Sequence, residues 1–212
     1  MKRLNLGLID YKEAYEIQKD LVKKVRDRSE EETLIICSHP SVVTLGKKST
    51  PSDLVGWEGP TYEIERGGQA TYHGPGQVVM YPILNLKVRG QNIAGYLEAM
   101  EQSMIEVLGA YGLPATGNTE RGMPDFTGVW LKLNPPKKVA SIGVAIQRWI
   151  TYHGLALNLY HDDQAFRGIN PCGFSTDTMT DLETILQKRL KRSDFEEQLS
   201  SSLILAFSKL LT

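Results

Sequence analysis

Hydrophobic and polar positions alternate with two different periods along this chain, and the period changes from helical to strand-like and back. Apolar residues recur at helical spacing over Asp10 to about Arg28, over Asn92–Tyr111 and over about Met179–Leu190, and a further helix is predicted to begin at Ser193. The segments between them are dominated by short apolar runs. The pattern therefore predicts helices at both ends of a strand-rich middle.

Local signals predict where these helices begin and end. Asp10 is placed to cap the first turn of the first helix. Gly112 and Pro114 are typical of a helix end after Tyr111. Ser193 and Glu196 have the spacing of a capping box, which predicts the start of the last helix.

Short β-rich runs predict the strands, and Gly, Pro and polar residues separate them. Gln147–Trp149 has the length of a hairpin connection, Lys47–Pro60 reads as a loop, and Pro135 with Pro136 indicates a turn. The predicted strands are Thr33–Cys37, Val42–Leu45, Tyr62–Glu65, Val78–Leu86, Gly128–Leu133, Val139–Ile146 and Ile150–Leu159.

The order of these elements favours an α+β arrangement. Strands and helices do not alternate regularly, which favours a mainly antiparallel or mixed sheet with helices on one side. With 212 residues and no internal repeat, we expect one domain over residues 1–212.

Composition and charge narrow the function classes. Hydrophobic residues make up 41% and charged residues 23% of the chain, which excludes a disordered protein. A net charge of −1 without a basic block argues against a nucleic-acid partner. The N-terminus lacks the pattern of a signal peptide, and no apolar run reaches the length of a membrane span. Only Cys37 and Cys172 are cysteines, as in a reducing compartment. We expect a cytoplasmic protein.

The segment Arg66–Gln77 carries the strongest local signal. Its sequence, RGGQATYHGPGQ, contains four glycines between two predicted strands. Glycine at such density indicates positive φ angles or another molecule close to the backbone. The segment precedes a strand and matches neither the Walker nor the dinucleotide pattern, so it does not indicate a phosphate site. The four histidines lack the spacing of a metal site.

The two cysteines have different settings. Cys172 lies in Pro171-Cys172-Gly173, a turn where a thiol is either an accessible nucleophile or a small buried filler. Cys37 follows an apolar run and is expected to be packed within a strand. A catalytic thiol needs a cation or base nearby, because little of it is thiolate at neutral pH.

The candidate cations and bases are His73, His153, Lys137 and Lys138. Lys138 begins a strand of small residues, as either a surface lysine or a group at the edge of a site. His73 is either a catalytic base or a ring that fixes its loop. His153 is expected to be a structural histidine with satisfied hydrogen bonds.

Four blocks in order make the chain similar to a known family. They are Arg66–Gln77, Lys138–Gly143, His153–Asn158 and Pro171–Gly173. Together they resemble the bacterial lipoyl(octanoyl) transferases, the LipB family. The resemblance implies an α/β fold of the α+β type like that of biotin and lipoate protein ligases, one domain with a central mixed sheet and flanking helices.

The resemblance also implies an activity. It implies transfer of an octanoyl group from octanoyl-acyl carrier protein to a lysine of a lipoyl domain, in 2-oxoacid dehydrogenase complexes or the glycine cleavage H protein, without cofactor. Cys172 is implied as the acyl-thioester nucleophile and Lys138 as the lysine beside it. The residues implied to bind substrate are Arg66, Gly67, Gly68, Gln69, Ala70, Thr71, Tyr72, His73, Ser141, Ile142, Gly143, Gly154, Leu155 and Ala156.

One departure from the family pattern affects the lysine. Leu131–Lys137 is longer than usual and makes Lys137 adjacent to Lys138. The register Lys-Val-Ala-Ser-Ile-Gly selects Lys138, and strand alternation directs Lys137 to the opposite face. Three alternatives remain open: an ATP-dependent lipoate or octanoate ligase of the same fold, an amidotransferase between carrier domains, and a non-catalytic module that docks acylated carriers.

Overall fold

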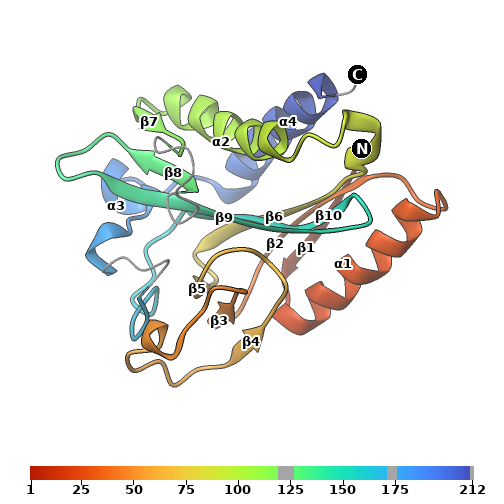
Figure 1. Ribbon diagram of the computed structural model, residues 1–212. Coiled ribbons are helices and arrows are strands. Elements are labelled where there is room, and N and C mark those ends of the chain that lie inside the picture. Colours follow the sequence, from red (N-terminus) through yellow and green to blue (C-terminus); the bar gives the residue numbers. More distant parts are fainter. Residues whose placement is uncertain (119–126, 171–175, 211–212) are drawn as a thin grey trace.

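The computed structural model describes residues 1–118, 127–170 and 176–210, and two sheets form its centre (Figure 1). The larger sheet has the strand order β1-β2-β6-β10-β9-β8-β7. It is mixed, because β1 and β2 are parallel while the other pairs are antiparallel. Its strands are β1 (Lys2–Leu8), β2 (Thr33–Ser38), β6 (Gln77–Ile83), β7 (Ala115–Thr116), β8 (Gly128–Leu131), β9 (Lys137–Gln147) and β10 (Ile150–Asn158).

The smaller sheet is built around the glycine-rich segment. Its order is β4-β3-β5, where β3 covers Val42–Leu45, β4 covers Thr61–Glu63 and β5 covers Thr71–His73. β5 lies inside the segment that the sequence predicted as a loop. Thr33–Cys37 and Val42–Leu45 were predicted as separate strands, and between them the chain passes from the larger sheet to the smaller one.

Helices cover both faces of the larger sheet, so the expectation of helices on one side was wrong. The helices are α1 (Tyr11–Arg26), α2 (Ile93–Ala110), α3 (Leu182–Leu186) and α4 (Arg192–Lys209). Figure 1 shows α2 and α4 side by side over one face and α1 against the other. The mixed sheet with flanking helices was predicted correctly.

Strand alternation explains why both faces need a cover. On β2, Leu34 and Ile36 pack into the core under α2 and α4, whereas Ile35 and Cys37 pack under α1. All four side chains are buried. A strand with a continuous apolar run, here Leu34–Cys37, that is buried at every position belongs to a sheet covered on both sides.

The helix signals at Asp10 and Gly112 were read correctly. Asp10 caps α1 by accepting hydrogen bonds from the backbone N–H groups of Lys12 (2.8 Å) and Glu13 (3.3 Å). Gly112 adopts φ +75° just after α2, a left-handed conformation that favours glycine.

The C-terminal helices differ from the prediction. The helix expected over Met179–Leu190 is reduced to α3, because Asp181 caps it through the N–H of Thr184 (2.7 Å) and Gln187 ends it at φ +50°. The expected capping box at Ser193 is absent: α4 begins one residue earlier, after Lys191, and the Ser193 hydroxyl donates to Asp194. No helix among the described residues is long and apolar enough to cross a membrane.

Candidate functional site

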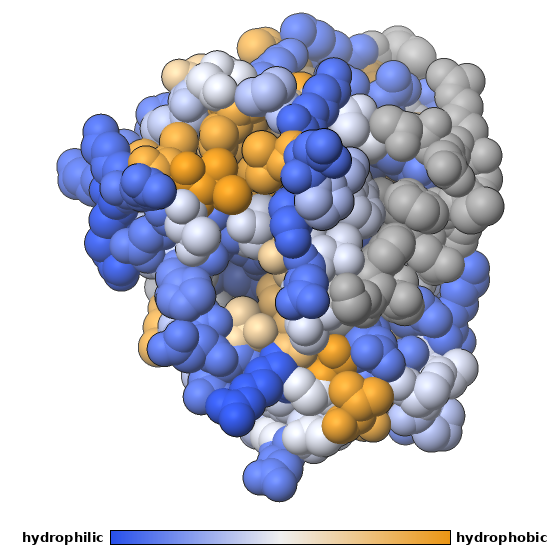
Figure 2. All heavy atoms as spheres, turned by 90° about the vertical axis from the view of Figure 1, so that its left-hand side faces the viewer, coloured by the Kyte–Doolittle hydropathy of each residue, from blue (hydrophilic) through white to orange (hydrophobic). Residues whose placement is uncertain are grey.

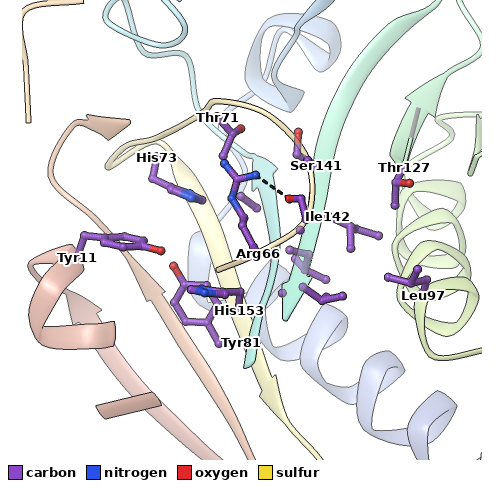
Figure 3. Close-up of a pocket in the computed structure, with 17 residues that line it drawn as sticks. Tyr11, Arg66, Thr71, His73, Tyr81, Leu97, Thr127, Ser141, Ile142 and His153 are labelled. Atoms are coloured by element: carbon purple, nitrogen blue, oxygen red, sulfur yellow. Dashed lines mark hydrogen bonds between the residues drawn. The ribbon is translucent and has the colours of Figure 1, made fainter. Parts of the chain in front are cut away.

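A cavity of about 170 Å³ lies where the glycine-rich segment meets β9 and β10 (Figure 3). The side of the molecule drawn in Figure 2 is hollowed near its centre, between two groups of apolar side chains. The residues implied as substrate-binding that line the cavity are Arg66, Gly67, Gly68, Thr71, His73, Ser141, Ile142, Gly143, Gly154, Leu155 and Ala156. Their placement around one cavity gives them a common site, and substrate binding by them stays a prediction.

Three residues implied as substrate-binding do not line this cavity. On β5, Thr71 and His73 face the cavity, so Tyr72 between them faces away. Ala70 is fully buried in an apolar cluster with Tyr72, and Gln69 lies outside the cavity lining. The prediction took the whole glycine-rich run as one wall, whereas the strand within it divides its side chains between two sides.

Arg66 is held against the cavity by the backbone around it. Its guanidinium donates to the carbonyl oxygen of Thr44 (2.8 Å), to the Thr44 hydroxyl (3.0 Å) and to the carbonyl oxygen of Gly67 (3.0 Å). Only 5% of the residue is exposed. A Cβ at Gly143 would lie 2.7 Å from Arg66 Cδ, so the glycine on β9 makes room for the arginine.

Aromatic and histidine rings form another part of the cavity, on the side that Figure 3 shows around Tyr11 and Tyr81. The His73 ring stacks on Tyr11 at 5.7 Å between centroids. His153 has φ +55° and donates its backbone N–H to Gln18 Oε1 (2.8 Å). The stacking holds the His73 ring, and the hydrogen bond holds the backbone of His153.

Burial keeps these imidazoles neutral. Burial and then the Arg66 charge lower the pKa of His153 to about 3. Burial, followed by the neighbouring His39 and Arg66, lowers the pKa of His73 well below its ordinary value. His73 Nδ1 and both ring nitrogens of His153 have no hydrogen-bond partner among the described residues. The expected hydrogen-bonded structural role of His153 was therefore wrong: the ring leaves its polar atoms in the cavity wall.

Lys138 is buried beside the cavity but is not part of its lining. It is 1% exposed, and its Nζ lies 5.4 Å from the centroid of the Trp130 ring. Gly128 on β8 adopts φ +134°, and a Cβ there would lie 3.0 Å from Lys138 Cε. The backbone oxygen of Lys138 accepts the N–H of Thr180 (3.0 Å).

Lys137 has a different environment from its neighbour. It is half-buried, and its Nζ donates to the backbone oxygen of Asp177. Of the two adjacent lysines, Lys138 is the one enclosed by the fold, as the strand register predicted. A catalytic role for it stays a prediction.

Cys172, the implied nucleophile, lies outside the described residues, but the chain on both sides of it is anchored. Before it, the N–H of Asn170 bonds to the backbone oxygen of Asp53 (2.9 Å), whose carboxylate accepts the N–H of Ala70 (3.4 Å). After it, Thr180 bonds to Lys138. The other cysteine, Cys37, is buried, and burial raises the pKa of its thiol. The prediction of a packed strand cysteine is confirmed.

Several cavity residues were not identified from the sequence. Tyr11, Tyr81, Leu97 and Val144 line the cavity together with Thr127. Tyr11 begins α1 and Leu97 lies on α2, and both looked like ordinary core positions of an amphipathic helix. Only the packing of these helices against the sheet brings them to the cavity. Within the described ranges, no group of histidine, cysteine and acidic side chains is arranged to hold a metal ion.

The family model of the lipoyl protein ligase A/B catalytic domain matches residues 10–204. A protein of Bdellovibrio bacteriovorus described as octanoyltransferase is 40% identical over 210 residues, 93% of this chain and 94% of that protein. An octanoyltransferase of Syntrophobacter fumaroxidans is 36% identical, with 97% of this chain and 90% of that protein covered.

Solved structures share the fold at much lower identity. A lipoate-protein ligase A bound with ATP superposes with a TM-score of 0.67 at 15% identity, covering 99% of this chain and 85% of that chain. A biotin protein ligase from Aquifex aeolicus with biotin and ATP gives a TM-score of 0.62 at 13% identity, covering 99% of this chain and 72% of that chain. The predicted relation to biotin and lipoate protein ligases is therefore confirmed at the level of the fold.

Proposed function

The chain belongs to the family of the lipoyl protein ligase A/B catalytic domain and, within it, to the octanoyltransferases; from that premise we propose how it works as an acyltransferase in protein lipoylation. The donor is octanoyl-acyl carrier protein, the acyl group passes through a thioester on Cys172, and the acceptor is a lysine of a lipoyl domain. The acceptors are the lipoyl domains of 2-oxoacid dehydrogenase complexes and the glycine cleavage H protein. Residues 1–212 act as one catalytic domain in the cytoplasm.

The observation that carries this proposal is the position of the cavity relative to Lys138. Ser141, Ile142 and Gly143 line the cavity, and the same strand carries the buried Lys138 as its second residue. An acyl chain in the cavity would thus lie along a strand that carries the Lys138 side chain near its start. Burying its methylenes at about 0.8 kcal/mol each contributes roughly 5 kcal/mol, which favours an eight-carbon chain over much shorter ones.

The reaction proceeds in two balanced steps. The Cys172 thiolate attacks the donor thioester carbon; a new C–S bond forms, the donor's C–S bond breaks, and the carrier thiolate leaves and takes up a proton. The acceptor amine then attacks the acyl-enzyme; a C–N bond forms, the bond to Cys172 breaks, and the amine loses a proton. Thioester exchange is nearly neutral in free energy and amide formation is downhill, so ATP is not required.

Lys138 acts on the thiol through its charge or as a proton carrier. As an ammonium it stabilises the Cys172 thiolate, which is the nucleophilic form. As a neutral amine it accepts the proton that the acceptor lysine releases.

A transfer assay without ATP tests the proposal. Octanoyl-acyl carrier protein and a lipoyl domain are mixed with the enzyme, and octanoylated lipoyl domain is followed by mass spectrometry. We expect product without ATP, and a loss of about 10³-fold or more in Cys172→Ala. A requirement for ATP together with full activity of Cys172→Ala would instead favour a ligase of the same fold. Full function of both Cys172→Ala and Lys138→Ala would favour a non-catalytic docking module.

A further inference from the structure

A second cavity, of about 140 Å³, lies on the other side of β5 from the first. Tyr72, whose neighbours Thr71 and His73 line the first cavity, lines this one. Gln77 from β6 and Asn158 from β10 contribute amide side chains to its wall. Of these three residues, the family resemblance implied only Tyr72 as substrate-binding and assigned no such role to Gln77 or Asn158.

The second cavity adjoins the segment that Lys138 holds. Met179 and Thr180 line the cavity, and both are attached to Lys138, Met179 through an isolated parallel bridge and Thr180 through its N–H. Asn158 Nδ2 donates to the backbone oxygen of Thr180 at 2.8 Å. One wall of the cavity is therefore tied directly to the strand of the proposed reaction centre.

The cavity presents a buried hydrogen-bond acceptor that the fold leaves unused. Gln77 is 4% exposed, and its Nε2 donates to Asn158 Oδ1 (2.9 Å) and to the backbone oxygen of Tyr72 (3.2 Å). Its Oε1 has no partner at hydrogen-bond distance and angle among the described residues, although a weaker interaction with Gln77 partly offsets the burial that lowers the pKa of the His73 ring. A buried polar atom without a partner costs free energy, so a ligand that donates to it is favoured.

Charge around the cavity favours a donor with positive charge. The carboxylates of Asp162 and Asp181 lie in the lining. Asp162 accepts the Tyr72 hydroxyl at 2.6 Å, and within the described ranges no cationic side chain forms an ion pair with it. The exposed His161 ring, whose pKa is raised by Asp181 and then Asp163, also lines the cavity.

Two arginines nearby are already engaged. Arg189 and Arg192 lie over the Tyr160 ring, at 3.9 and 5.2 Å from its centroid. Arg189 pairs with Glu183, and Arg192 pairs with Glu196 and donates to the backbone oxygen of Gln77. Their charges are therefore largely compensated. Asp181 pairs with His161, whereas Asp162 accepts the Tyr72 hydroxyl and the N–H of Gln164 and has no cationic partner among the described residues.

The rest of the lining is apolar. Tyr72, Phe166 and Met179 contribute side chains that suit a chain of methylenes. A lysine side chain has this chemistry, with a four-carbon stem that packs on apolar surface and a terminal nitrogen that donates hydrogen bonds and accepts none when charged.

We propose that the second cavity receives the acceptor lysine of the partner domain, whose terminal nitrogen donates to Gln77 Oε1 beside Asp162. This inference rests on the proposed function and adds a separate entrance for the acceptor. The acyl chain occupies the cavity on one side of β5, and the acceptor side chain approaches from the other side.

Measuring the two half-reactions separately tests this division. Acylation of the enzyme by octanoyl-acyl carrier protein is followed by intact mass, and discharge of the isolated acyl-enzyme by a lipoyl domain is followed in single turnover. For Gln77→Leu we expect acylation within about 3-fold of wild type and discharge slowed about 10-fold or more. Gln77→Glu keeps an acceptor oxygen and is expected to discharge faster than Gln77→Leu.

Matched variants control for charge and for folding. We expect Asp162→Asn to slow discharge by about 3- to 10-fold, because Asn keeps an acceptor for Tyr72 but removes the charge. Asp163→Asn, at an exposed neighbour outside the cavity, should discharge at the wild-type rate. Discharge by hydroxylamine, which needs no lysine site, should be equal in all variants.

The outcomes separate this inference from the proposed function. Equal discharge by the lipoyl domain in wild type and Gln77→Leu would overturn it, as would a variant that loses acylation instead of discharge. If no acyl-enzyme forms in wild type, the proposed function fails. Titration calorimetry of the lipoyl domain with unacylated protein then tests whether the second cavity binds the acceptor lysine. Binding to Gln77→Leu that is about 10-fold weaker than to wild type supports this inference, and equal binding overturns it.

Discussion

Thr71, Tyr72 and His73 follow one another on β5, yet the first and third line one cavity and the second lines the other. The first cavity contains neutral imidazoles whose pKa burial lowers, His73 and His153. The second contains His161, whose pKa the neighbouring carboxylates raise. One strand thus separates a space lined by glycines and buried histidines from one lined by acidic side chains and an exposed histidine. The comparison teaches that consecutive residues of one short motif can line two cavities with different chemistry.

The largest effect is expected at Lys138, which lies on the strand that lines the first cavity and bonds to the Met179–Thr180 wall of the second. Replacing it with Met keeps the length of the buried stem but removes the charge, and we expect the rate of acyl transfer to fall by about 10²-fold or more. The matched variant Lys137→Met should stay within about 3-fold, because that side chain is half-buried on the other face. Single-turnover transfer measures both, and circular dichroism checks the fold. Equal losses in the two variants would contradict the assignment.

Two glycines of the first cavity should respond differently to the same added methyl group. At Gly154 a Cβ would meet the backbone oxygen of Met80 in β6, which is paired with β10. We expect Gly154→Ala to lower the free energy of unfolding by about 1–3 kcal/mol, as overpacking does. At Gly143 it would meet the Arg66 side chain instead, so Gly143→Ala should be less destabilising and slow octanoyl transfer more. Urea unfolding measures the loss of stability in each variant, and octanoyl transfer assays measure the loss of rate. A larger loss of stability in Gly143→Ala than in Gly154→Ala would contradict the placement of Arg66.

The histidines of the two cavities predict opposite responses to pH. The pKa of His153 is about 3 in the folded protein, below its ordinary 6.5, so the unfolded chain binds more protons between these values. Stability is therefore full above pH 6.5 and falls as the pH drops toward 3, by about 2 kcal/mol at pH 5 from this ring alone. His161 has a raised pKa, so its contribution is present below pH 6.5 and is lost as the pH rises.

Urea unfolding at pH 7 and pH 5 tests this sign. His153→Asn, which tolerates positive φ, should lose about 2 kcal/mol less than wild type between the two pH values. His161→Asn should not reduce the loss. An unchanged acid response in His153→Asn would show that this ring is protonated in the folded state.

Much of the fold could be predicted from the sequence, because helix caps and turns depend on residues that are close together in the chain. Asp10 and Gly112 satisfy helix ends directly, and Gln147–Trp149 provides a turn whose residues Arg148 and Trp149 both have positive φ. The C-terminal prediction failed where tertiary contacts dominate: Met179 and Thr180 bond to Lys138 and cannot join a helix. β1 was not predicted, although Leu4, Leu6 and Leu8 alternate with polar residues and glycine, the pattern of a strand with one buried face.

Only the site residues that belong to short sequence motifs could be predicted. The glycine-rich segment, Lys138 and Gly154 stand out in the sequence, whereas Tyr11 and Leu97 enter the cavity through helix packing that no short pattern reveals. The division of β5 between two cavities also depends on register. A strand of three residues, Thr71–His73, inside a glycine-rich run has no periodicity long enough to predict.

The central claim, that Cys172 carries the acyl group, is tested most directly by intact-mass spectrometry. The enzyme is incubated with octanoyl-acyl carrier protein in the absence of an acceptor, alongside Cys172→Ser and Cys37→Ser. We expect wild type and Cys37→Ser to gain the mass of one octanoyl group, in a linkage that hydroxylamine removes, and Cys172→Ser to gain none. No gain in wild type, or an equal gain in Cys172→Ser, would contradict the account.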